Sequence, residues 1–114
     1  MDANLTNYRQ IIQQILANYA ALIKRTPEPG QETELVLDEA RDHYILHTTG
    51  WDKKGRVLET TIYVRLRNGK FWIEVDWTGK GVANDLVTAG VPPEDIVLAF
   101  HHSEVRPLTE FAVA

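Results

Sequence analysis

The sequence contains no cysteine, which excludes a disulfide scaffold, thiolate zinc sites, iron–sulfur clusters and a cysteine nucleophile. It also lacks any apolar run close to the roughly 20 residues of a membrane-spanning helix. Its first residues, MDANLTNYRQ, show no basic region leading into an apolar one. We therefore expect a cytoplasmic protein without a membrane partner. Its 114 residues give room for a single domain, 1–114, with one hydrophobic core.

Positive charge is also in short supply. The chain has 12 Lys and Arg against 16 Asp and Glu, which gives a formal net charge of −4. Because avid unaided binding to duplex nucleic acid normally needs a concentrated basic face, this balance argues against such binding. Composition by itself assigns no function.

The strongest periodic pattern lies between Leu5 and Lys24. Apolar residues recur there at steps of three and four, while Arg, Gln and Asn occupy the other face. This spacing predicts an amphipathic helix with a wide buried stripe. Pro27 and Pro29 must end the helix, because neither can continue a helix interior.

After this helix the pattern is typical of strands separated by short turns. The strands that we predict cover residues 35–37, 43–51, 56–67, 70–77 and 96–100. Asn68-Gly69 is the strongest hairpin signal in the chain. A short helical pattern near Val82 to Val87 has Gly90 placed as its left-handed cap. The apolar tail residues Phe111 to Val113 predict a C-terminal segment that docks on the domain.

The turns fix an expected pairing of the strands. A two-residue loop at Asn68-Gly69, together with closure of Asp52 on Arg56, sets apolar residues opposite one another on one buried face. The expected buried pairs are Leu66–Phe71, Val64–Ile73, Ile62–Val75, Leu46–Ile62 and Tyr44–Val64. The expected pairs on the other face include Tyr63–Glu74 and Thr61–Asp76. The fold class is then α+β, a two-layer sandwich in which one long N-terminal helix packs on a mainly antiparallel sheet with a short C-terminal helix.

The residues that could carry chemistry do not form a recognisable catalytic or metal motif. The histidines are His43, His47, His101 and His102. His43 and His47 would lie roughly 13 Å apart along a strand, too far to bind one ion. Ser103 lacks the Gly-x-Ser-x-Gly context, and the loop Thr78 to Gly81 lacks the spacing of a phosphate loop. We expect no catalytic residue, no metal and no cofactor.

The second face of the predicted sheet is the best candidate for a functional surface. Its residues are aromatic, histidine or arginine side chains with one isoleucine, and no second long helix is available to cover them. They are His43, Ile45, His47, Tyr63, Arg65 and Trp72. Three alternatives remain open: the tail covers the face, the face binds a protein, or it is a platform for single-stranded nucleic acid. Glu59, Glu74 and Asp76 oppose the third alternative.

Several segments resemble those of one known family. They are Tyr8-Arg9-Gln10-Ile11-Ile12, Arg41-Asp42-His43-Tyr44, Asn68-Gly69-Lys70-Phe71-Trp72-Ile73 and, most specifically, Ala89-Gly90-Val91-Pro92-Pro93-Glu94-Asp95 with Thr109-Glu110-Phe111-Ala112-Val113. In this order the chain resembles the XisI family, the fdxN element excision controlling factors of filamentous cyanobacteria. The resemblance implies a small protein that, with a XisH partner of nuclease-type fold, supports programmed excision of a DNA element by a separate recombinase. It supplies no catalytic residues.

Three hypotheses follow. The first is a non-enzymatic controlling factor that acts through a XisH-like nuclease-fold protein, with a homodimer as a further possibility and DNA contacted indirectly. The second is a direct DNA-binding subunit that uses basic residues near one end of the hairpins. Those residues are Lys53, Lys54, Arg56, Arg65, Arg67 and Lys70. The third is a small hydrolase with Glu74 or Asp76 and the histidines as its site.

Overall fold

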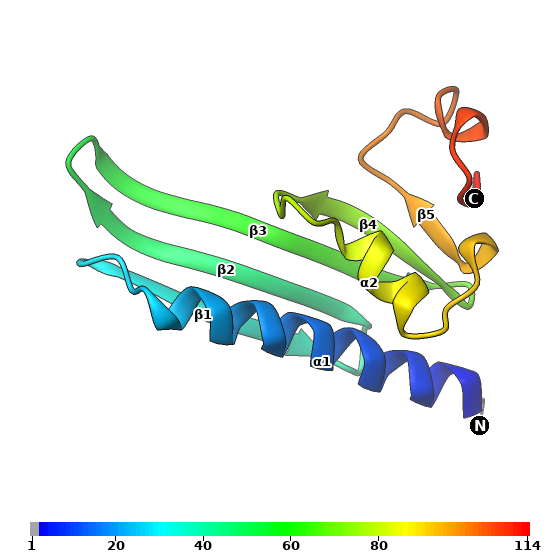
Figure 1. The fold of residues 1–114 in the computed structure, drawn as a ribbon, viewed down its shortest axis with the longest axis horizontal. Coiled ribbons are helices and arrows are strands. Elements are labelled where there is room, and N and C mark those ends of the chain that lie inside the picture. Colours follow the sequence, from blue (N-terminus) through cyan, green and yellow to red (C-terminus); the bar gives the residue numbers. More distant parts are fainter. Residues whose placement is uncertain (1–2) are drawn as a thin grey trace.

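The computed structural model describes residues 3–114, and these residues form a five-stranded sheet with two helices (Figure 1). The long helix α1 (Ala3–Arg25) comes first, as the apolar periodicity predicts. The five strands are β1 (Gln31–Asp38), β2 (His43–Asp52), β3 (Gly55–Arg67), β4 (Lys70–Asp76) and β5 (Ile96–Leu98). The short helix α2 (Val82–Thr88) lies between β4 and β5, and single 3-10 turns occupy Pro93–Asp95 and Arg106–Leu108.

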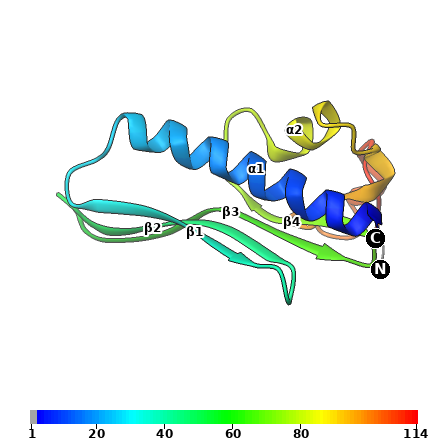
Figure 2. The same ribbon diagram turned by 90° about the horizontal axis from the view of Figure 1, so that it is seen from below.

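The strands follow one another across the sheet in the order of the sequence. All neighbours are antiparallel except β4 and β5, which are parallel because α2 carries the chain back across the sheet between them. Both helices lie on the same face, and no helix covers the other (Figure 2). The predicted fold class, an α+β two-layer sandwich, is confirmed.

The core lies between α1 and this covered face of the sheet. Ile12 and Leu16 of α1 are fully buried, as are Tyr44, Leu46 and Ile62 of the sheet. Since alternate residues of a strand point to opposite faces, burial of Tyr44 and Leu46 turns their neighbours in β2 toward the uncovered face. Within residues 4–114, every fully buried side chain is hydrophobic.

The β3–β4 pairing confirms two predicted contacts and corrects a third. Leu66 pairs with Phe71 and Val64 with Ile73, across a loop in which Asn68 and Gly69 both have positive φ. The register then shifts between Tyr63 and Val64, so Val75 lies opposite Tyr63 and not opposite Ile62. The expected pairs Ile62–Val75, Tyr63–Glu74 and Thr61–Asp76 are therefore wrong, because a β-bulge adds one residue to β4.

The β2–β3 pairing also contains a bulge. Leu46–Ile62 and Tyr44–Val64 are confirmed, but Asp52 pairs with Gly55, so its predicted closure on Arg56 is wrong. A register shift next to Leu46 absorbs the extra residue in β3. Because of this bulge, the register at the turn differs by one residue from the register of the buried pairs. Counting one residue against one residue from the turn therefore cannot give both. At the turn, the Asp52 carboxylate accepts the N–H of Lys54 at 2.7 Å and that of Gly55 at 3.1 Å.

The C-terminal part closes the β5 side of the sheet. Gly90 has φ +99, and Val91 N–H donates to the Leu86 carbonyl at 3.0 Å, which confirms the left-handed cap of α2. Residues 97 and 112 form a parallel bridge, so the tail docks as expected. The predicted strand over 96–100 is shorter, because β5 ends at Leu98. In the part of the chain that the structure describes, no helix has the length and apolar character needed to cross a bilayer.

Candidate partner-binding face

The structure brings all six candidate residues to the uncovered face of the sheet. His43, Ile45 and His47 alternate with buried residues along β2, and each is half-buried. The register sets His43 beside Arg65 and Ile45 beside Tyr63, and Arg65 is in turn beside Trp72 of β4. We call these six residues, His43, Ile45, His47, Tyr63, Arg65 and Trp72, the open face.

Hydrogen bonds hold both imidazoles of the open face against the sheet. The Tyr63 hydroxyl and His43 Nδ1 are 2.7 Å apart, with ring centroids separated by 5.8 Å. His47 Nδ1 lies 3.0 Å from Thr60 Oγ1. Side chains fixed in this way lose little conformational entropy when a partner packs on them. These hydrogen bonds therefore hold the two imidazoles of the open face in fixed orientations.

Trp72 marks the end of the open face nearest the C-terminal tail. The guanidinium carbons of Arg67 and Arg106 lie 5.5 and 5.7 Å from its ring centroid. Arg106 belongs to the tail and donates to the carbonyls of Ala99, His101 and Val113. Of the ring and hydrogen-bond contacts made by the six residues, the one between Arg106 and Trp72 comes from the tail.

The border of the open face along β1 is acidic. Glu34 lies opposite His47, and Asp38 lies opposite His43. These neighbours were not predicted, because the apolar run at 35–37 indicates only a short strand and names no partner for it. The alternation of Glu32, Glu34 and Val36 in β1 is the signal that could have revealed them.

The six basic residues proposed for DNA binding do not gather at one place. Lys53, Lys54 and Arg56 lie at or next to the β2–β3 turn, whereas Arg65, Arg67 and Lys70 lie near the β3–β4 turn. These turns are at opposite ends of β3, which spans roughly 40 Å at the usual rise of a strand (Figure 1). The expectation that they share one end of the hairpins is wrong.

The carboxylates considered for catalysis have structural surroundings. Asp76 accepts hydrogen bonds from the backbone and hydroxyl of Thr78, at 2.9 and 2.6 Å, and from Val82 N–H at 2.7 Å. It thereby caps the start of α2, on the face opposite the histidines. Among residues 3–114, no group of three or more His, Asp or Glu is arranged to hold a metal ion.

Sequence reasoning missed the polar contacts that tie the helices to the sheet. Arg9 of α1 donates two hydrogen bonds to Asp42, at 2.8 and 3.0 Å, and this lowers the pKa of that carboxyl. The Tyr44 hydroxyl also donates to Asp42, at 2.8 Å. Burial and this carboxylate raise the pKa of Tyr44. Within Arg41-Asp42-His43-Tyr44, Asp42 thus ties α1 to the sheet, and Tyr44 supports it.

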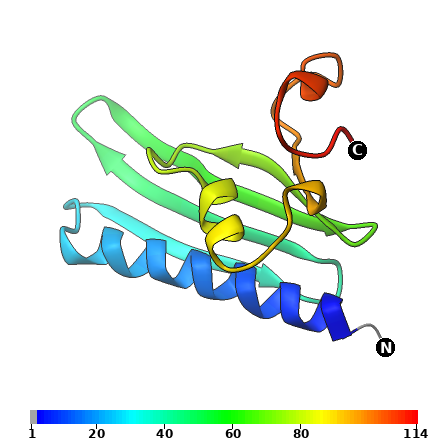
Figure 3. The same cartoon turned by 45° about the vertical axis from the view of Figure 1, so that its right-hand side comes forward.

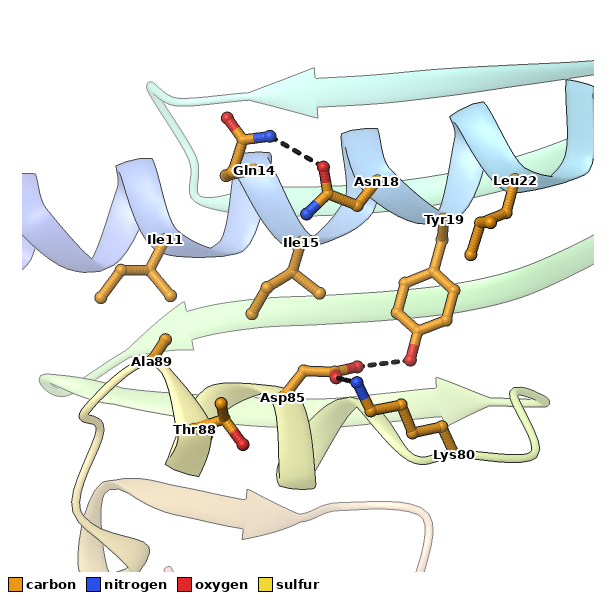
Figure 4. A pocket seen from close by; sticks show the side chains of 10 residues that line it. All are labelled: Ile11, Gln14, Ile15, Asn18, Tyr19, Leu22, Lys80, Asp85, Thr88 and Ala89. Atoms are coloured by element: carbon orange, nitrogen blue, oxygen red, sulfur yellow. Dashed lines mark hydrogen bonds and ion pairs between the residues drawn. The ribbon is translucent and has the colours of Figure 1, made fainter.

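An apolar cleft of about 400 Å³ lies between α1 and α2 (Figure 4). Ile11, Ile15 and Leu22 line it, and Tyr19, Asp85 and Lys80 close one end. These three polar groups satisfy one another: the Tyr19 hydroxyl donates to Asp85, and Lys80 Nζ lies 2.7 Å from the second oxygen of Asp85. Gln14, Asn18 and Thr88 add further polar side chains to the lining, and Gln14 donates to Asn18 at 2.9 Å.

In the described residues, two helices on one face of a five-stranded sheet and an uncovered second face define a small α+β two-layer domain (Figure 2). A family model described as "XisI protein" matches residues 1–113. The chain belongs to the XisI family, which confirms the resemblance carried by its segments. No curated protein matches the chain.

Two solved structures show how similar the fold is. The fdxN element excision controlling factor XisI from Anabaena variabilis is 42% identical, with a TM-score of 0.87 over 97% of this chain and 99% of that one. A XisI-like protein from the same organism is 33% identical, with a TM-score of 0.89 over 96% of this chain and 99% of that one.

Proposed function

We propose that this protein is a non-enzymatic controlling factor for programmed excision of a DNA element of the fdxN type, and that it acts by binding a XisH-like partner of nuclease-type fold. Membership of the XisI family and similarity to a XisI excision controlling factor support the role. The carrying observation is the open face. In the part of the chain that the structure describes, both helices lie on one side of the sheet (Figure 3). The other side carries aromatic, histidine and arginine residues on neighbouring strands.

The composition of this face fits a protein partner. Aromatic residues and arginine are enriched at the centres of protein interfaces, where they supply much of the binding energy. Here Tyr63, Arg65 and Trp72 lie side by side on neighbouring strands. At the border along β1, the carboxylate of Glu34 disfavours a phosphate backbone and favours a partner with a basic group, whereas Asp38 is already paired with Arg41 at 3.0 Å.

The distribution of charge supports indirect contact with DNA. The net charge is −4, and the basic residues are divided between the two ends of β3. Neither end concentrates the charge that duplex binding requires. In the proposed complex the DNA chemistry belongs to the partner, and this chain supplies the binding face.

The test is co-expression with a XisH-like protein, followed by pull-down and calorimetric titration. Ile45→Lys places a charge at the centre of the open face, and Val87→Lys places the same charge on exposed α2. We expect at least about a tenfold loss of affinity for Ile45→Lys and no change for Val87→Lys. Absence of a complex at micromolar concentrations, or equal effects of the two variants, would contradict the proposal.

The DNA hypothesis has its own measurement. A gel shift with element-border DNA at low salt should show no binding by this chain alone. Salt-sensitive binding that is lost in Arg65→Ala or Arg67→Ala would instead make the chain a direct DNA-binding subunit. The far-ultraviolet circular dichroism of each variant confirms that it remains folded.

A further inference from the structure

The strand β1 forms an edge of the sheet that nothing in the described chain covers. It is eight residues long and, within residues 3–114, pairs only with β2. Its pairing with β2 contains no bulge, and its sequence QETELVLD contains neither proline nor lysine. Edge strands are normally protected by such features against pairing with another chain. β1 has no bulge, proline or lysine, and its charged residues, Glu32, Glu34 and Asp38, are all acidic.

The register shows which backbone groups of β1 point outward. Trp51 N–H donates to the Gly30 carbonyl at 3.0 Å, which makes these two a hydrogen-bonded pair. In an antiparallel ladder such pairs alternate with pairs that are not hydrogen-bonded. The even-numbered residues of β1 therefore bond to β2, while the N–H and C=O groups of Thr33, Leu35 and Leu37 point away from the sheet. Within residues 3–114, these groups accept or donate no other hydrogen bond.

A groove runs along this edge on the helix side. It has a volume of about 710 Å³ and lies between α1 and β1. Leu35 and Leu37 form its floor with Ile11, and Gln10, Gln13 and Gln14 form its helix wall. Leu37 is 39% exposed, so its apolar surface is available to an incoming side chain. An open strand edge beside a helix is the arrangement in which proteins bind extended peptides by strand addition.

The other face of the edge carries negative charge. Glu32, Glu34 and Asp38 alternate with the groove-lining residues, and Glu32 and Glu34 are exposed. A strand added to β1 would thus meet the groove with every second side chain. Its other side chains would meet the exposed carboxylates of Glu32 and Glu34 and, next to them, the exposed apolar side chain of Val36. This pattern defines the chemistry of the occupant.

We infer that the β1 edge binds an extended segment of a partner protein in which apolar residues alternate with lysine or arginine. The segment pairs with the outward groups of Thr33, Leu35 and Leu37, its apolar side chains enter the groove, and its basic side chains lie beside Glu32 and Glu34. The site adjoins the open face at Glu34, but its backbone groups and its groove lie outside that face, and the inference does not depend on the proposed function.

A second copy of this chain fits the edge less well. In a symmetric antiparallel pairing of β1 with itself, centring on Leu35 sets Glu32 opposite Asp38, and centring on Glu34 sets the two copies of Glu34 opposite each other. Centring on Val36 sets Glu34 opposite Asp38. Each of these registers places like charges directly across the ladder, which is destabilising. A basic strand has no such conflict.

The probe is a fluorescein-labelled eight-residue peptide of alternating lysine and valine, titrated with the full chain and followed by fluorescence anisotropy. Two control peptides separate the contributions. One replaces lysine by glutamate, and the other keeps the charges but is N-methylated at every second residue, which removes the backbone donors that would face β1. We expect each control peptide to bind at least about tenfold more weakly.

Substitutions in β1 test the same contacts on the protein. Leu37→Pro removes an outward N–H without breaking the ladder to β2, and Leu37→Ala is its matched control. Leu37→Pro should weaken peptide binding more than Leu37→Ala. The double variant Glu32→Gln, Glu34→Gln should bind the lysine peptide more weakly than the wild type does. It should bind the glutamate peptide at least as tightly as the wild type does.

Amide hydrogen exchange followed by nuclear magnetic resonance locates the site. In the free chain the amides of Thr33 and Leu35 should exchange faster than those of Glu34 and Val36, and the lysine peptide should slow them. Equal binding of the N-methylated peptide, or unchanged exchange at Thr33 and Leu35, would overturn the inference. Slow exchange of these two amides that depends on protein concentration without peptide would also overturn it, because a second copy would then occupy the edge.

Discussion

Arg9 of the long helix holds both carboxylate oxygens of Asp42, at 2.8 and 3.0 Å, across the join between α1 and the β1–β2 turn. Asp42 has φ +59, a left-handed conformation that only glycine, asparagine and aspartate adopt readily. Its carbonyl also accepts Leu66 N–H at 3.1 Å. One residue therefore connects α1, β2 and β3.

Replacing Asp42 by Asn tests this connection, because Asn tolerates the same backbone conformation but has no charge. The pKa of Asp42 is lowered by the hydrogen bonds from Arg9, so its stabilisation is complete above the unfolded pKa of about 4 and is lost as the pH falls through the folded value. Urea unfolding should show that Asp42→Asn is less stable than the wild type at pH 7, with a smaller difference at pH 3. A difference that grows on acidification would contradict this assignment.

The tyrosines on α1 should ionise late. Burial, followed by a hydrogen bond to Asp95, raises the pKa of Tyr8 to about 12, and burial with Asp85 does the same for Tyr19. A raised pKa stabilises the fold below the unfolded value of about 10 and loses this effect as the pH rises toward 12. In an ultraviolet titration, Tyr8→Phe and Tyr19→Phe should each lose part of the absorbance change that the wild type shows near pH 12. If the variants instead lost absorbance change near pH 10, the two phenols would not be buried and hydrogen-bonded to Asp95 and Asp85.

Two leucines of the β2–β3 hairpin should differ sharply in their contribution to stability. Leu46 is fully buried opposite Ile62, whereas Leu58 is 68% exposed. Leu46→Ala should lower the free energy of unfolding by about 2–5 kcal/mol, because it removes buried surface and leaves a cavity. Leu58→Ala should change it by less than about 0.5 kcal/mol. Chemical denaturation measures both, and similar losses would mean that the core is not where α1 meets the sheet.

Gly50 should tolerate no side chain. A Cβ atom there would lie 2.1 Å from the Gly30 carbonyl oxygen, and its φ is +141. Gly69 also has positive φ, but nothing lies within 4 Å of a Cβ at that position, so it is the matched control. Gly69→Ala should cost about 1 kcal/mol from backbone strain alone. Thermal unfolding of Gly50→Ala should show a clearly larger loss, since the start of β1 must move.

The elements that the sequence predicted well depend on local patterns. The apolar spacing from Leu5 to Lys24 needs no tertiary contact to indicate a helix, because it reports the period of one element. Asn68-Gly69 likewise determines its hairpin from two residues that accept positive φ. Gly90 was identified as the cap of α2 for the same local reason.

A β-bulge separates each wrong pairing from the confirmed ones. In the β3–β4 hairpin the wrong pairs lie beyond the bulge as counted from the turn, and in the β2–β3 hairpin the wrong pair is the turn closure itself. Counting from a turn assumes one residue opposite one residue, and the shifts near Leu46 and Tyr63 break that assumption. A bulge forms where buried side chains and turn geometry demand different registers, and both demands involve residues far apart in the chain. The Arg9–Asp42 and Tyr8–Asp95 contacts were not predicted for a related reason. The first joins residues that are 33 positions apart in the chain, and the second joins residues that are 87 positions apart.

By itself, the sequence determined the helix, the turns and the alternation that turns His43, Tyr63 and Trp72 away from the core, because period and turn chemistry are local properties. Only the tertiary structure decided that α1 and α2 share one face, that the basic residues separate along β3, and that β1 is left as an unpaired edge beside a groove. These features follow from the packing of whole elements, in which apolar surface is buried wherever chain connectivity allows.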